Sequence, residues 1–137
     1  MPYELVESPE SIQLSVSAPG REELFRDSLT GVLAAAYGAP LTEGTSEGRV
    51  VPLQATGDDD DALLAGLVEE ALRAVQEEEG TLLPPRWLAF DVNRVTVNLP
   101  VQAPKVAARP LGISRAEAEG GEGGWNARLE LLRLKTD

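Results

Sequence analysis

The chain has 137 residues, of which 42% are hydrophobic and only 4% aromatic. This predicts one folded domain over residues 1–137 with a core of aliphatic side chains. The absence of cysteine and histidine excludes disulfides, thiolate metal sites, and catalysis by a cysteine nucleophile or a histidine base. Twelve basic residues against 23 acidic ones leave a formal charge of −11. This charge argues against direct binding to nucleic acid and favours a basic protein partner. An equal alternative is that the acidity serves only to keep the protein soluble.

The first part of the chain predicts two strands, a helix and a third strand. Residues 3–7 and 12–18 predict the first two strands, since Ile12 and every second residue after it are apolar. The segment 21–38 predicts a helix with an apolar stripe that ends at Gly38, and the segment 49–55 predicts an edge strand that contains Pro52. The stripe consists of Phe25, Leu29, Val32, Leu33 and Ala36.

The second part predicts another helix and then four strands. Apolar residues repeat at helical spacing from Leu64 to Val75, and Gly80 is the predicted stop of this helix. A glycine-rich, acidic stretch at about 116–124 predicts a flexible loop. The order of elements predicts an α+β fold, with a mixed or mostly antiparallel sheet and two amphipathic helices packed on it. The four strands are predicted at 87–92, 94–101, 106–114 and 125–134.

Acidic runs flank the second helix. Asp58 to Asp61 precede its apolar stripe, where aspartate caps a helix and favours the positive end of the helix dipole. A calcium site is the alternative, but the alternating spacing of calcium loops is absent. Glu77, Glu78 and Glu79 stand at the opposite end, where the dipole disfavours anions. We expect either a solvated helix end or a partner-binding acidic patch there.

Three local segments resemble the archease family across almost the whole chain. "YELVE" followed by "EELFRDSLTGVLAAAYG" is similar to the opening of the family, and "ALLAGLVEEALRAVQEEEG" to its second helix. "GGWNARLELL" is similar to the closing strand, which carries a Trp-x-Ala pattern. Archeases are small acidic proteins that assist the RNA ligase joining cyclic-phosphate ends in tRNA splicing and RNA repair. The resemblance therefore implies an archease-like fold and a non-catalytic accessory role beside a basic ligase.

The family's metal-binding and motif positions are altered in this chain. Where archeases carry His-Thr-Ala-Asp, the aligned residues run from Ser8 to Ser11, and the closing metal-binding aspartate aligns with Leu132. The Thr-Tyr-His of a further motif aligns with Arg109, Pro110 and Leu111. The resemblance thus implies a degenerate metal site and an activity that is lost or altered.

Oxygen ligands near the altered motif leave a residual metal hypothesis. Glu7, Glu10 and Glu130 are the candidate carboxylates for weak binding of calcium or magnesium, against an interpretation as surface residues. No cofactor is otherwise expected. The N-terminal sequence lacks the basic and apolar regions of a signal peptide, and no apolar run reaches membrane-spanning length, so we expect a cytoplasmic protein without membrane contact. The alternative function is an acidic protein-interaction or small-ligand module on the same fold, unrelated to RNA ligation; a carboxylate-dependent or metal-dependent enzyme has the least support.

Overall fold

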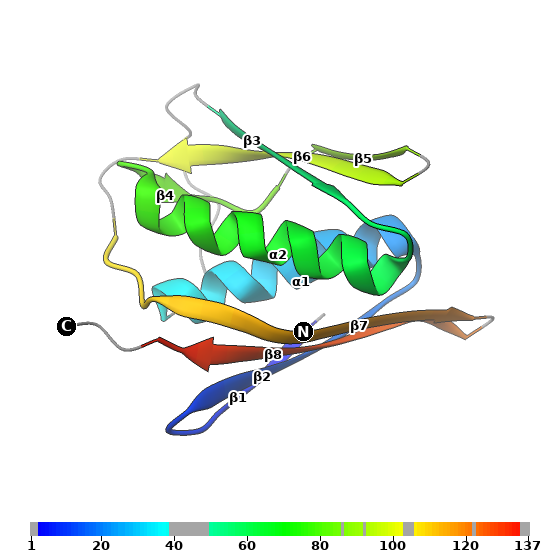
Figure 1. Ribbon diagram of the computed structural model, residues 1–137, viewed down its shortest axis with the longest axis horizontal. Helices are drawn as coiled ribbons and strands as arrows, with labels where there is room; N and C mark the ends of the chain where they lie inside the picture. Colours follow the sequence, from blue (N-terminus) through cyan, green and yellow to red (C-terminus); the bar gives the residue numbers. More distant parts are fainter. Residues whose placement is uncertain are drawn as a thin grey trace.

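Two antiparallel sheets enclose two helices in the computed structural model, which describes residues 3–38, 50–85, 87–91, 93–102, 106–121 and 123–134. Figure 1 shows both helices lying between the sheets. The predicted α+β class is confirmed. Periodicity did not predict the division of the strands into two sheets, because alternation shows which face of a strand is buried and not which strand pairs with it.

The first sheet has the strand order β1-β2-β8-β7. It consists of β1 (Tyr3–Glu7), β2 (Ser11–Ala18), β7 (Leu111–Gly121) and β8 (Gly124–Arg133). Its inner face packs on the helices, and the alternation predicted for residues 12–18 is confirmed there. The buried residues of β2 and β8 are Ile12, Leu14, Val16, Ala18, Ala127, Leu129 and Leu131.

The second sheet covers the other side of the helices. β6 (Arg94–Gln102) pairs with β3 (Val50–Thr56), β4 (Thr81–Leu82) and β5 (Trp87–Asp91). Along the described parts of the chain, β3 pairs with β6 alone, which confirms the edge position predicted from Pro52.

The helices supply the centre of the core. The stripe of α1 (Arg21–Tyr37) is fully buried, and Gly38 ends the helix with a φ of 82° and an N–H donated to the carbonyl of Ala34. A Cβ at Gly31 would lie 2.7 Å from Leu14, so this glycine lets α1 approach β2 closely. None of the helices described here is long and apolar enough to cross a bilayer.

Three of the four aspartates at the start of α2 (Asp60–Glu77) contact different structural partners. Asp59 is the N-cap, and its Oδ1 accepts the N–H of Ala62 at 2.8 Å. Asp60 Oδ1 accepts a hydrogen bond from Nη2 of Arg21 at 2.6 Å. Asp61 Oδ1 accepts a hydrogen bond from the N–H of Ala118 on β7 at 2.7 Å. The capping interpretation of this run is confirmed.

Three predicted boundaries were wrong. Helix α2 ends at Glu77, three residues before the predicted stop at Gly80, and Glu78 is extended. The strand predicted at 106–114 begins only at Leu111. Residues 116–121 belong to β7 rather than to a flexible loop, because Ala116 and Ala118 alternate inward with outward glutamates, and the missing Cβ of Gly120 leaves room for the ring of Trp125, which packs against the core.

Candidate functional site

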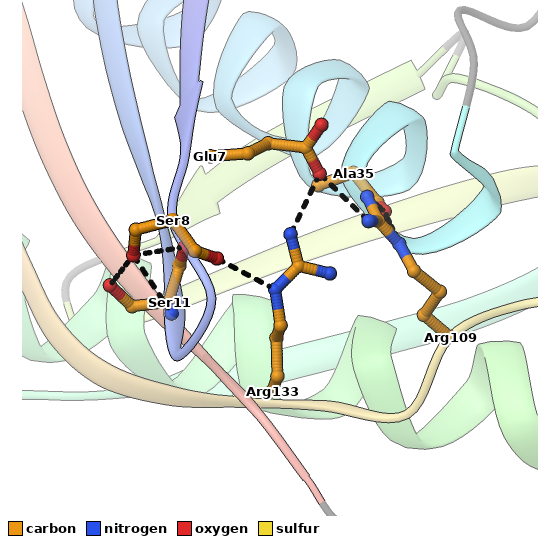
Figure 2. Close-up of polar contacts among 6 residues, drawn as sticks. All are labelled: Glu7, Ser8, Ser11, Ala35, Arg109 and Arg133. Atoms are coloured by element: carbon orange, nitrogen blue, oxygen red, sulfur yellow. Dashed lines mark hydrogen bonds and ion pairs between the residues drawn. The ribbon is translucent and has the colours of Figure 1, made fainter.

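The turn between β1 and β2 is held together by its own serines. The Ser8 N–H donates to the carbonyl of Ser11 at 2.9 Å, and the Ser11 N–H donates to Oγ of Ser8 at 3.2 Å. The two hydroxyls lie 3.1 Å apart (Figure 2). Residues 8–11, where the family resemblance placed a metal-binding motif, therefore form a self-bonded turn.

Three segments far apart in the sequence meet beside this turn. Ser11 lies directly opposite Leu132 in the β2–β8 ladder, and Leu132 lies opposite Gly112 in the β8–β7 ladder. Directly opposed residues of antiparallel strands bring their Cβ atoms to about 5 Å. The two positions aligned with metal-binding aspartates are thus cross-strand neighbours, next to the end of the third altered motif at Leu111.

Glu7 links these segments through hydrogen bonds and ion pairs on the inner side of the sheet. Its Oε1 accepts Nη1 of Arg109 at 2.7 Å and Nη2 of Arg133 at 3.1 Å. Arg133 also donates Nε to the carbonyl of Ser8 at 3.0 Å and its backbone N–H to the carbonyl of Glu10 at 3.1 Å. Figure 2 shows the Glu7 carboxylate between the two guanidinium groups. One carboxylate thereby links β1, β8 and the segment before β7.

Arg109 connects this network to the end of α1. Its Nε and Nη2 donate to the carbonyl of Ala35 at 3.0 and 2.5 Å, and its backbone N–H donates to the carbonyl of Ala36 at 2.7 Å. The last turn of α1 contains no basic residue of its own. Arg109 therefore supplies from a distant segment the donors and the positive charge that a helix C-terminus favours.

The electrostatics of the cluster favour an ionised Glu7. The hydrogen bond and the charge of Arg109 lower the pKa of Glu7, and Arg133 lowers it further. At neutral pH this carboxylate is an acceptor, and it is not suited to donate a proton as a general acid.

The three candidate metal carboxylates are not brought together. Glu7 lies on the helix side of the first sheet, whereas Glu130 lies on the outer face, where its Oε2 accepts Nε2 of Gln13 at 2.8 Å. Glu10 lies exposed in the turn. In the described ranges, no group of three or more acidic side chains is arranged to hold a metal ion.

The aligned metal positions themselves do not fit a hard cation. Calcium and magnesium require several oxygen ligands. Leu132 offers none, and the Ser11 hydroxyl already contacts Ser8. The segments meet, but the two aligned positions, Ser11 and Leu132, carry no carboxylate.

The acidic end of α2 borders two hollows of the surface. One hollow lies toward β3 and includes Glu77 and Glu78 in its lining. The other lies toward β7 and includes Glu77. Within the described residues, Glu79 lines neither hollow and is exposed.

The sequence interpretation missed the roles of both arginines. Arg109 was noted only as an altered motif position, and Arg133 was not singled out. Each is a single arginine among apolar residues, and no local pattern shows that it will meet Glu7 more than 100 residues away in the sequence. Only the strand pairing brings them together.

Comparison with known proteins gave no match, either to a protein-family model or to a curated protein.

Proposed function

We propose that this protein is a non-catalytic, archease-like accessory protein of an RNA ligase that joins cyclic-phosphate ends, acting without the family's metal. The observation that carries the proposal is the cross-strand pairing of Ser11 with Leu132. These two positions were aligned with metal-binding residues from sequence resemblance alone, and a ligand pair of one metal site has to be close in space. Their pairing supports the alignment, and through it the accessory role that the resemblance implies.

The arginine network shows how these segments are linked without a cation. In a metal site, the ion draws separate segments together through its ligands. Here Arg109 and Arg133 converge on Glu7 and on the carbonyls of Ser8 and Ala35, so fixed guanidinium groups link the same segments. Bidentate and charge-assisted contacts of arginine suit this purpose.

The accessory role is tested by RNA joining with the purified ligase of the same organism and an excess of RNA carrying cyclic-phosphate ends. We expect this protein to raise the number of RNA molecules joined per ligase. Arg133→Gln, which removes the guanidinium contacts with Glu7 and with the carbonyl of Ser8, should reduce the stimulation. Arg128→Gln, at an exposed arginine on the outer face of the same strand, is the matched control and should not. Unchanged turnover with the unmodified protein would contradict the proposal and favour an interaction module unrelated to RNA ligation.

The metal-free state is tested separately by thermal unfolding. A cation that binds the folded chain raises its melting temperature in proportion to the logarithm of concentration over Kd. We expect calcium, magnesium and manganese to leave the melting temperature unchanged at millimolar concentrations. A rise that grows with the logarithm of the concentration of any of these cations would contradict this part of the proposal while leaving the ligase test unaffected.

A further inference from the structure

An apolar groove lies between α2 and β7. Its volume is about 290 Å³, and its apolar lining comes from Leu72 of α2, from Leu111 and Ile113 of β7, and from Leu134 after β8. Leu134 is 51% exposed, and Leu132 beside it is 40% exposed. Figure 1 shows α2 running alongside β7, which is an edge strand of the first sheet.

The edge of β7 is covered along only part of its length. In the described residues β7 pairs with β8 alone. Toward the hairpin tip, the Asp61 carboxylate accepts the N–H of Ala118 and so protects that end of the edge. The groove occupies the opposite end, at Leu111 to Ile113.

Acidic residues lie along the α2 side of the apolar floor. Glu69 and Glu77 line the groove, and so does Arg73, whose guanidinium forms an ion pair with Glu70. The last turn of α2 contains no basic residue. The negative end of the helix dipole therefore adds to the charge of Glu77.

We propose that this groove binds a basic peptide segment of a partner protein, with an aliphatic side chain on the Leu72–Leu134 floor and lysine or arginine side chains beside Glu69 and Glu77. The charge around the groove selects the cationic segment, and the apolar floor distinguishes it from a purely electrostatic ligand. The groove adjoins the meeting of the three segments, since Gln76 in its lining donates to the carbonyl of Arg109 at 3.3 Å. The inference holds for any basic partner and does not depend on the role in RNA ligation.

The test measures fluorescence anisotropy of a labelled peptide in which lysines flank two leucines. We expect saturable binding that weakens as salt is raised. Replacing the two leucines of the peptide by serine should weaken binding about tenfold, since the buried aliphatic contact is lost. Equal binding of the serine peptide, or no binding of the leucine peptide, would overturn the proposal.

Variants of the protein locate the binding. Leu134→Ser should weaken binding by about tenfold, and the pair Glu69→Gln with Glu77→Gln by about threefold at low salt. The pair Glu4→Gln with Glu22→Gln removes the same charge from exposed positions on β1 and α1, and it should leave Kd unchanged. Leu134 is exposed, and circular dichroism verifies that each variant is folded. Equal weakening by both glutamate pairs would show that only the overall charge matters and would overturn the assignment to this groove.

Discussion

The C-terminal ends of α1 and α2 both carry the negative end of a helix dipole, but their surroundings differ. Neither helix has a basic residue in its last turn. The end of α1 receives Arg109, which donates to the carbonyls of Ala35 and Ala36 and holds Glu7. The end of α2 instead carries Glu77 as its last residue. The acidic residues behind the formal charge of −11 therefore serve different purposes. Near the end of α1, Glu7 pairs with arginines and stabilises the fold. Near the end of α2, the acids lie on the surface and line a groove.

A substitution of Arg109, at the C-terminal end of α1, should reduce the free energy of unfolding the most. Arg109→Met retains the aliphatic stem but removes the donors to Ala35 and Glu7. We expect the free energy of unfolding in urea to fall by about 2 kcal/mol, the size of a lost charge-assisted hydrogen bond. Arg115→Met is the control, because that side chain is 71% exposed and its ion pair with Glu117 is long, at 3.9 Å. An equal loss in both variants would remove the distinction between the two helix ends.

The next effect contrasts two neighbouring aspartates at the N-terminal end of α2. Asp59→Ala removes the cap that accepts the Ala62 N–H and should lower the free energy of unfolding by about 1 kcal/mol. Asp58→Ala, at the exposed residue before the cap, should change it by only about 0.3 kcal/mol. Urea denaturation of both variants measures the difference, and a larger effect at Asp58 would contradict the assignment of the cap.

Acid sensitivity tests the ion pairs of Glu7 with Arg109 and Arg133. Since Arg109 and Arg133 lower its pKa below the ordinary value of 4.5, its ion pairs stabilise the fold fully above that value. The contribution is lost as the pH falls from 4.5 through the lower pKa of the folded state. Glu7→Gln should therefore flatten the fall in stability in this range and lower stability at neutral pH. The measurement is the free energy of unfolding against pH, and an unchanged acid slope would contradict the role of the ion pairs.

The smallest expected effect has the opposite sign. Glu77→Gln removes a negative charge from the negative end of α2 and should raise the free energy of unfolding by about 0.3 kcal/mol at low salt. The gain should disappear at high salt because exposed charges are screened. A loss of stability in the urea experiment would show that Glu77 contributes to the fold and is not retained for a partner.

Local patterns predicted the elements well because each element has its own period of burial. The stripe of α1, the alternation of Ile12, Leu14 and Val16, and the aspartate cap of α2 are all visible in a few neighbouring residues. The strand in 116–121 was missed because glycine and glutamate are typical of loops. There, inward alanines and the packing of Trp125 over Gly120 outweigh local preference.

The sequence predicted which residues belong to the candidate site but not which of them contact one another. Resemblance pointed to residues 8–11 and to Leu132, and the register places Ser11 opposite Leu132. The cluster around Glu7 was beyond sequence reasoning, since Arg109 and Arg133 reach it through strand order and the position of α1. Register and sheet order depend on the whole core, which no single segment encodes.

The most direct test of the account is hydrogen–deuterium exchange of the chain with and without the RNA ligase of the same organism. We predict slower exchange in the peptides that include residues 111–113, where the edge of β7 borders the groove, and unchanged exchange in residues 94–101 of β6, which lies paired within the second sheet. Protection confined to the second sheet would place the ligase away from the groove. Unchanged exchange throughout the chain at saturating ligase would contradict the accessory role itself.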